Sequence, residues 1–234
     1  MITARKFLNS LIKELNYSSF CEIGYHNGET TEAINLSNDQ KVSVDPSPDI
    51  STKYINGMSG GDPRRPGYSL RYCKHDLRLM TSDKFFETNE RQFDLFLIDG
   101  DHSYEQVYRD IQNSLKFLTP RGVIFCHDAA PFNIELTTKN RCGDAYKAIL
   151  RLRTEKNNLT VYALNEYITD YGPSDPSGYA LIFRQYQEPW KEKLNLDDKN
   201  FNAYEYMINN YRELLTFIKF QKALQIIKER NKKL

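Results

Sequence analysis

Two apolar runs, at residues 93–98 and 122–126, constrain the fold of this chain more than any other feature. Each run is nearly continuous, and each ends in polar groups: Asp99 after the first, and His127 with Asp128 after the second. Such runs are typical of strands that are buried on both faces of a parallel sheet. Segments with helical spacing alternate with the strand-like runs, and this alternation predicts a doubly wound α/β fold.

The other strand-like runs complete the predicted sheet. They lie at 20–24, 41–45, 159–164 and 179–183. The last two flank a turn-rich stretch, which predicts an antiparallel hairpin at the edge of the sheet. These six runs and one further short strand would make a Rossmann-like, mostly parallel, seven-stranded sheet, which we expect within a domain over residues 1–190. A C-terminal helical extension is expected over residues 191–234.

The last part of the chain, residues 197–234, is predicted to be one long helix. Its apolar residues alternate three and four apart, as in a coiled coil. They are Phe201, Tyr204, Ile208, Tyr211, Leu215 and Ile218. Two interpretations fit this stripe equally well: the helix packs on its own domain, or it forms the interface of a homodimer.

The composition excludes several classes of partner. Lys and Arg total 32 against 31 Asp and Glu, so a net charge of +1 gives no long-range attraction to nucleic acid or anionic lipid. No apolar stretch approaches the roughly 20 residues that a membrane span needs. The four cysteines form no CxxC pair, and the first residues have no signal-peptide core. We expect reduced cysteines and a cytoplasmic protein.

A glycine-containing turn follows the first predicted strand, in the sequence Glu22-Ile-Gly24-Tyr-His-Asn-Gly28. Its two glycines permit a tight turn and a close approach of the backbone to a ligand. The GxxxG spacing differs from the GxGxxG that favours a pyrophosphate, and an acid at Glu22 would attract a cationic sulfonium or amino group. Asp45 ends the next strand, where an acid accepts hydrogen bonds from ribose hydroxyls. Together these residues predict a cofactor site.

At these positions the chain resembles the class I S-adenosylmethionine-dependent methyltransferases. Its E-x-G-x-x-x-G run is similar to their first motif, and Asp45 is similar to their ribose-binding acid. In that family a polar residue after the third strand lies beside the adenine, and His75-Asp76 is the natural match. The edge hairpin also fits this family. The resemblance implies that S-adenosylmethionine is bound by Glu22, Gly24, Gly28, Asp45, His75, Asp76 and Asp99.

The ends of the two buried runs carry a second set of polar residues. The sequence DGDHSYE occupies 99–105, and a histidine and an aspartate follow the next strand. Neighbouring strands would bring Asp99, His127 and Asp128 together above the sheet. Two carboxylates and an imidazole can form a divalent metal site with open positions.

The DGDHSYE run, followed by a strand ending in HD, resembles a narrower group: the metal-dependent sugar O-methyltransferases that tailor macrolide and aminocoumarin antibiotics, with related enzymes of surface-glycan pathways. The resemblance implies that Asp99, His127 and Asp128 hold Mg²⁺ or another divalent cation, which chelates hydroxyls of a sugar or nucleotide sugar. One branch of the group has a catalytic base that matches Asp101, and the other has one that matches His102. Both residues are present here, so the base is left open.

Two features limit this assignment. Position 127 is His where the group has an acid, and Mg²⁺ prefers oxygen ligands, so His127 favours a softer metal or indicates a weakened metal site. Asp101 or Ser103 would also serve simply as the cap of the following helix.

We expect an O-methyltransferase that acts on a hydroxyl of a small molecule. A nicotinamide-dependent sugar oxidoreductase is the alternative in another enzyme class, but the GxxxG spacing and the lack of a well-placed Tyr-x-x-x-Lys pair argue against it. A catechol-type or nucleic-acid methyltransferase is a further alternative, since phenolic diols chelate metals in a similar way. A binding module without chemistry is disfavoured by the acidic and histidine residues at the strand ends.

Overall fold

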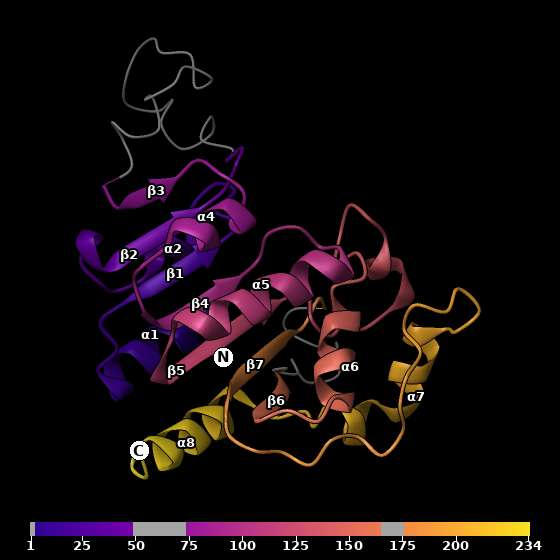
Figure 1. Cartoon of the computed structure of the whole chain (residues 1–234). Helices are drawn as coiled ribbons and strands as arrows, with labels where there is room; N and C mark the ends of the chain where they lie inside the picture. The colour runs from indigo at the N-terminus through magenta and orange to yellow at the C-terminus, as the bar shows by residue number, and fades with distance from the viewer. Residues whose placement is uncertain (1–2, 49–73, 165–175) are drawn as a thin grey trace.

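A seven-stranded sheet with the order β3-β2-β1-β4-β5-β7-β6 forms the centre of the computed structural model, which describes residues 3–48, 74–164 and 176–234 (Figure 1). The strands are β1 (Phe20–Ile23), β2 (Lys41–Val44), β3 (Asp76–Arg78), β4 (Phe93–Ile98), β5 (Leu118–His127), β6 (Leu159–Leu164) and β7 (Tyr179–Arg184). Strands β3, β2, β1, β4 and β5 are parallel, and β7 is antiparallel to both β5 and β6. The predicted parallel sheet with an edge hairpin is confirmed.

Helices cover both faces of the sheet. They are α1 (Ala4–Leu15), α2 (Glu29–Ala33), α4 (Ser82–Thr88), α5 (Tyr104–Phe117), α6 (Tyr146–Thr154), α7 (Ala203–Leu214) and α8 (Phe220–Asn231). Alternate residues of β4 point to opposite faces: Leu95 and Leu97 pack with α1 and α8, whereas Phe96 and Ile98 pack with α4, α5 and α6. The continuous apolar run at 93–98 is explained by this burial on both faces.

The register of the central strands aligns their ends. Ile23 pairs with Ile98, and Ile98 pairs with Cys126. Gly24, Asp99 and His127 follow these three residues, so they emerge side by side at the carboxyl edge of the sheet. Ligands of open α/β sheets bind at this edge.

The prediction of one long helix over 197–234 is wrong, because α7 and α8 are separate helices. Between them the chain leaves the helical path and pairs with the outer strand of the sheet: Ala163 N donates to Leu215 O at 2.9 Å, and Ile218 N donates to Ala163 O at 2.9 Å. Thr216 turns the chain with a left-handed φ of 49°. The residues between α7 and α8 therefore hydrogen-bond to the otherwise open edge of β6 instead of continuing the helix.

Helix α8 packs against α1. The rings of Phe7 and Phe220 stack with their centroids 4.6 Å apart, and Phe220, Ala223 and Ile227 share one core with α1. The residues after 190 therefore complete the core of the sheet domain, while the domain boundary at 190 stays a prediction.

The apolar stripe predicted for a dimer interface is divided in the structure. Leu215 is fully buried, and Phe201 and Tyr204 pack against the core of their own chain, whereas Ile208 is exposed. The side chain of Tyr211 lies outside the described residues. Homodimer formation stays a prediction.

Three of the four cysteines can be placed. Cys21, Cys126 and Cys142 are buried free thiols, as predicted, and Cys73 lies outside the described residues. Among the helices described, none is long and apolar enough to cross a membrane.

Candidate active site

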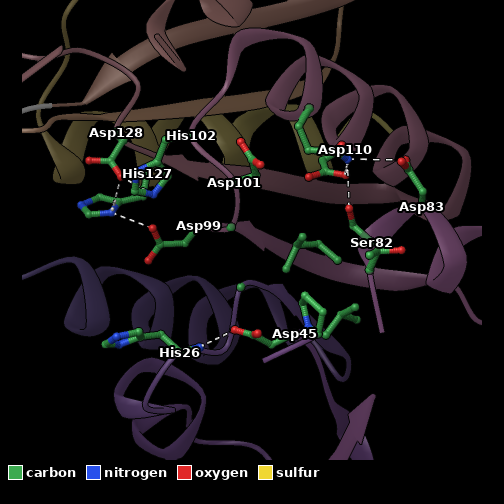
Figure 2. Close-up of a pocket in the computed structure, with 17 residues that line it drawn as sticks. His26, Asp45, Ser82, Asp83, Asp99, Asp101, His102, Asp110, His127 and Asp128 are labelled. Carbon is green, nitrogen blue, oxygen red and sulfur yellow. Dashed lines mark hydrogen bonds and ion pairs between the residues drawn. The ribbon is translucent and has the colours of Figure 1, made fainter. Parts of the chain in front are cut away.

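A cavity of about 630 Å³ opens at the carboxyl edge of β1, β2, β4 and β5 (Figure 2). The strand-end residues that line it are Gly24, Asp45, Asp99, Asp101, His102, His127 and Asp128. Other walls come from the turn after β3 and from α5: Thr81, Ser82, Asp83, Gln106 and Asp110. One cavity therefore contains both the predicted cofactor loop and the predicted reaction residues.

Gly24 allows β1 and β4 to approach closely at the floor of the cavity. Its φ of +92° lies in the left-handed region, and a Cβ on this residue would lie 2.1 Å from Asp99 O. Both the conformation and the space therefore exclude a side chain here.

Asp45 accepts a hydrogen bond from the backbone of the glycine loop and so holds the loop in place. Its Oδ2 accepts a 2.8 Å hydrogen bond from His26 N, and its Oδ1 accepts a 2.7 Å hydrogen bond from Ser47 N. His26 has a left-handed φ of 46°, which turns its N–H toward the carboxylate. Each carboxylate oxygen can accept a further hydrogen bond, so Asp45 keeps acceptor capacity at the wall of the cavity. Its binding of ribose hydroxyls stays a prediction.

Two predicted cofactor residues of the same loop lie behind the cavity and do not line it. Gly28 begins α2 with φ +71°, and a Cβ there would lie 2.2 Å from the ring of Tyr25. Glu22 is buried and hydrogen-bonds to the hydroxyl of Thr31. Burial raises the pKa of Glu22 to about 8, opposed by the bond from Thr31.

The prediction that His75 and Asp76 follow the third strand is wrong. Strand β3 begins at Asp76, so these residues lie at its start, at the edge of the sheet away from the cavity. His75 is buried, with Nε2 3.0 Å from Ser43 Oγ, and Asp76 pairs with Arg78 at 2.7 Å. The residues that do follow β3 and line the cavity are Thr81, Ser82 and Asp83.

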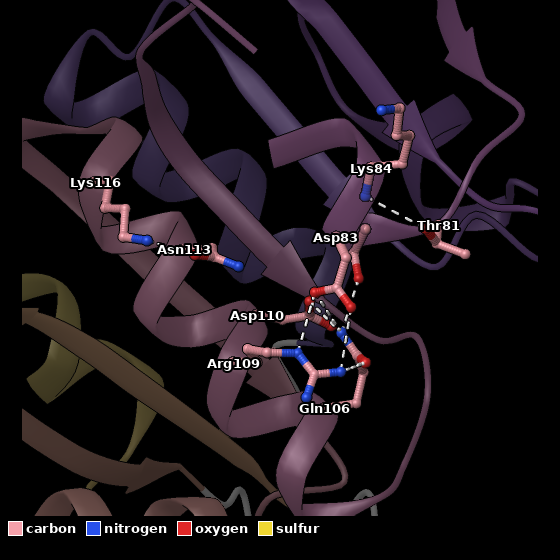
Figure 3. Close-up of polar contacts among 9 residues, drawn as sticks. Thr81, Asp83, Lys84, Gln106, Arg109, Asp110, Asn113 and Lys116 are labelled. Carbon is pink, nitrogen blue, oxygen red and sulfur yellow. Dashed lines mark hydrogen bonds and ion pairs between the residues drawn. The ribbon is translucent and has the colours of Figure 1, made fainter. Parts of the chain in front are cut away.

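Asp110 is a cavity residue that the sequence analysis missed (Figure 3). It is 1% exposed, and Gln106 Nε2 donates to its Oδ1 at 3.0 Å and to Ser82 Oγ at 3.1 Å. Burial raises the pKa of Asp110 to about 6. Its burial could have been predicted from helical spacing, because Asp110 lies on the same face of α5 as the core residues Val107 and Ile111.

The other end of the cavity contains two imidazole–carboxylate pairs. His102 Nε2 lies 3.1 Å from Asp128 Oδ2, and His127 Nδ1 lies 2.9 Å from Asp99 Oδ1 and 3.5 Å from Asp128 Oδ2 (Figure 2). Asp128 is 5% exposed and has a left-handed φ of 55°. A non-glycine residue held in this conformation is typical of functional sites.

These groups converge closely enough to hold a cation. Single ligand atoms of Asp99, His102 and Asp128 all lie within 4.8 Å of one another. His127, which was predicted to be in this group, lies against the same two carboxylates, whereas the imidazole of the converging set is that of His102.

The two candidate bases differ in their surroundings. His102 Nδ1 hydrogen-bonds to the carbonyl oxygen of Arg141, which only accepts, so Nδ1 carries the hydrogen and Nε2 of the neutral ring carries the lone pair. Asp101 Oδ1 instead accepts a 2.7 Å hydrogen bond from Ser103 N, and this bond lowers the pKa of Asp101. A proton gained at His102 Nε2 would be stabilised by Asp128 Oδ2, 3.1 Å away, whereas Asp101 Oδ1 already accepts the bond from Ser103 N.

The first turn of α5 is capped from another part of the chain. Ser103 occupies the N-cap position without a side-chain hydrogen bond to the helix, whereas Asp144 Oδ1 accepts a 2.7 Å bond from Tyr104 N. Asp144 N donates to His102 O at 3.1 Å. The hypothesis that the side chain of Ser103 caps α5 is therefore wrong. Asp101 accepts a bond from Ser103 N, just before the helix.

Comparison with known proteins gives a family match for part of the sequence and a set of structures with the same fold. Residues 21–129 match the family model described as a methyltransferase domain. No protein with a curated function matches the sequence.

Solved structures with the same fold include three O-methyltransferases. The enzyme from Bacillus cereus, in complex with SAH, is 17% identical with a TM-score of 0.54, and the match covers 77% of this chain and 80% of that one. A putative O-methyltransferase from Klebsiella pneumoniae is 18% identical with a TM-score of 0.53, over 80% of this chain and 82% of that one. TomG from Streptomyces achromogenes, involved in tomaymycin synthesis and solved with SAM, is 12% identical with a TM-score of 0.55, over 80% and 82%. Residues 21–129 of this chain thus match a methyltransferase domain model, and the chain shares its fold with these enzymes.

Proposed function

We propose that the protein is an S-adenosylmethionine-dependent O-methyltransferase that acts on a hydroxyl of a small molecule, namely a sugar or nucleotide sugar. One observation carries the proposal: a single cavity joins the glycine loop and Asp45 to the group formed by Asp99, His102 and Asp128. A cofactor held at the first end would present its methyl group to an acceptor held at the second. The acidic and imidazole lining of the second end suits an acceptor with several hydroxyls.

The reaction needs alignment and the removal of one proton. The acceptor oxygen attacks the methyl carbon, the bond from that carbon to sulfur breaks, and the hydroxyl proton passes to His102 Nε2. Asp128, 3.1 Å from that nitrogen, stabilises the imidazolium that forms. The enzyme's main contribution is to hold oxygen, carbon and sulfur in line, which is a proximity effect.

We further propose that Asp99, Asp128 and His127 bind a divalent cation. Their donor chemistry fits, since His127 Nδ1 lies within 3.5 Å of both carboxylates. A nitrogen ligand favours Mn²⁺, Fe²⁺ or Zn²⁺ over Mg²⁺. When bound, the cation would chelate acceptor hydroxyls and lower their pKa. His102 is left out of the ligand set because its Nε2 is needed for the proton.

Calorimetry with S-adenosylmethionine, SAH and NAD tests the cofactor. We expect the first two to bind and NAD not to bind. Asp45→Ala should weaken SAH binding between a few-fold and a hundred-fold, since each hydrogen bond to a charged group contributes about 1.5–3 kcal/mol. Asp39→Ala is the matched control, because Asp39 is exposed and does not line the cavity. Tight NAD binding without SAH binding would support the oxidoreductase alternative instead.

Turnover with nucleotide sugars and with catechols, followed by mass spectrometry, tests the acceptor. Methylation of catechols alone would contradict the sugar assignment and favour a catechol-type enzyme. With the acceptor identified, His102→Ala should lower kcat by about 10²–10⁴-fold, the usual cost of losing a general base, and Asp101→Asn should not.

Chelator treatment and metal titration test the cation. Chelator should abolish transfer and leave SAH binding nearly intact, because the cofactor is held by other residues. His127→Ala should weaken metal binding, while His102→Ala should not. A rate that is indifferent to chelator would remove the cation from the mechanism and leave His127 as the residue that orients Asp99.

A further inference from the structure

A row of hydrogen-bonded, buried polar side chains lies behind the cofactor loop and is not used by the reaction described above. Glu22 of β1 hydrogen-bonds to Thr31 Oγ1 of α2. Thr31 Oγ1 lies 2.9 Å from Ser43 Oγ of β2, and Ser43 Oγ lies 3.0 Å from His75 Nε2, just before β3. All four residues are buried, with His75 the most exposed at 6%. This row of hydrogen bonds is therefore continuous and sheltered from water.

We propose that Glu22, Thr31, Ser43 and His75 form a proton relay through which Glu22 responds to the charge on the cofactor, so that Glu22 favours the cationic S-adenosylmethionine over its neutral-sulfur product SAH. This inference rests on the proposed cofactor. It makes Glu22 a specificity residue that acts through charge rather than by contact, since Glu22 does not line the cavity.

The chemistry of the chain permits two hydrogen-bond directions. With Glu22 protonated, Glu22 donates to Thr31, Thr31 to Ser43, and Ser43 to Nε2 of His75, which then carries its hydrogen on Nδ1. With Glu22 ionised, every hydrogen bond reverses and the hydrogen of His75 lies on Nε2. The change between the two states releases one proton from His75 Nδ1, and that atom lies 3.9 Å from Glu32 Oε1, whose side chain is 43% exposed. The relay thus connects a buried acid to a half-exposed one.

The surroundings of Glu22 favour its protonated form. Burial is the main cause that raises the pKa of Glu22 to about 8; the hydrogen bond from Thr31 lowers it, and the carboxylates of Asp99 and Asp45, which line the cavity, contribute to the rise. A cation in the cavity acts on Glu22 with the opposite sign to those two carboxylates. It therefore favours the ionised form of Glu22.

At the other end, His75 stays neutral. Burial lowers its pKa, Glu32 and Asp76 raise it, and Lys41 lowers it. The Nζ of Lys41 donates to Thr31 O at 3.2 Å, beside the middle of the relay. A neutral imidazole can pass a proton from one nitrogen to the other side of its ring, which the relay requires.

The direction of the pH effect follows from linkage. S-adenosylmethionine binds better to the ionised form of Glu22, and the ionised fraction rises as pH passes through the pKa of about 8. The preference for S-adenosylmethionine over SAH should therefore rise by up to about tenfold per pH unit below pH 8 and level off above it. After methyl transfer the sulfur loses its charge, and Glu22 recovers its proton through the same chain.

Calorimetric titration of both ligands from pH 6 to pH 9 tests the inference. The affinity ratio of the wild type should rise with pH, and Glu22→Gln should remove that part of the rise. Should Glu22→Gln fail to fold, the wild type alone is decisive: at pH 7, titrations in buffers of different ionisation enthalpy should show more protons released by S-adenosylmethionine than by SAH. Equal proton release, or the same pH course in wild type and Glu22→Gln, would overturn the proposal. Failure of both ligands to bind would instead refute the proposed function.

The relay itself is tested by interrupting it. In Ser43→Ala, proton release followed by stopped flow with an indicator dye should become at least about tenfold slower than cofactor binding, because a proton cannot pass the gap. Ser114→Ala is the matched control, since Ser114 is a buried serine of α5 whose Oγ has no hydrogen-bond partner among the described residues. Unchanged release in Ser43→Ala would show that the proton leaves by another route.

Discussion

Asp144→Ala is expected to cost both stability and turnover, because Asp144 caps one helix and holds the loop that positions His102. The substitution removes the 2.7 Å hydrogen bond from Tyr104 N to Asp144 Oδ1 and a half-exposed ion pair with Lys147, of which the first is the cap. Loss of an N-cap costs about 0.5–2 kcal/mol. The side chain of Asp144 is 40% exposed, so water replaces part of the bond, and about 1 kcal/mol is the appropriate value. In a chain of this size that lowers Tm by about 2–4 °C.

The effect on turnover should be larger than the effect on stability. His102 is held by two contacts to the 141–144 segment, from Nδ1 to Arg141 O and from Asp144 N to His102 O. When the segment loses its attachment to α5, His102 Nε2 moves relative to the acceptor, and a displacement of about 1 Å can cost a hundred-fold in rate. SAH binding should be unchanged, because Asp144 does not line the cavity.

Scanning calorimetry, steady-state kinetics and SAH titration measure the three quantities. Asp144→Asn is the matched control, since its amide oxygen can still accept the bond from Tyr104 N. If Asp144→Ala leaves Tm unchanged, or if Asp144→Asn slows turnover as much as Asp144→Ala, the side-chain oxygen is not the attachment and the reasoning is refuted.

Three further outcomes are expected. Phe220→Ala should reduce the free energy of unfolding by about 3–5 kcal/mol in urea titrations, as for other buried phenylalanines, while exposed Tyr186→Ala should not. Gly24→Ala should abolish SAH binding in calorimetry, because its Cβ would lie 2.1 Å from Asp99 O. The pKa of Asp110 is raised to about 6 by burial, so its contribution to stability is present near pH 4 and is lost as pH rises through 6. Asp110→Asn should flatten the dependence of Tm on pH in that window, and an unchanged dependence would contradict this assignment.

The sequence was most informative where strands are buried on both faces. The runs that became β4 and β5 could be predicted because burial on two sides leaves few polar residues in them, and the polar groups that follow them then mark the sheet edge. Asp99, His127 and Asp128 were therefore placed together correctly. Strand β3 has only three residues, with one of them buried, so its position could not be read from periodicity, and His75 was assigned to the wrong end.

The features that could not be predicted depend on contacts between residues far apart in the chain. Glu22 has the identity expected of a cofactor contact, but alternation along β1 turns its side chain toward α2 rather than into the cavity. The orientation of His102 depends on the carbonyl of Arg141, 39 residues away, and no local pattern encodes that bond. The break between α7 and α8 depends on the open edge of β6, which becomes apparent only once the sheet is assembled.

The packing of α8 on α1 has a consequence for the order of folding. An ion pair joins Glu14 to Lys228 across 214 positions of the chain, in the same interface as Phe7 and Phe220. Closing so long a loop costs entropy before any contact is gained, so this interface should form late, after the central strands have paired. Substitutions in α8 should then speed unfolding while hardly changing the rate of folding. During folding, the side of α1 that faces α8 would therefore stay exposed to water until α8 packs against it.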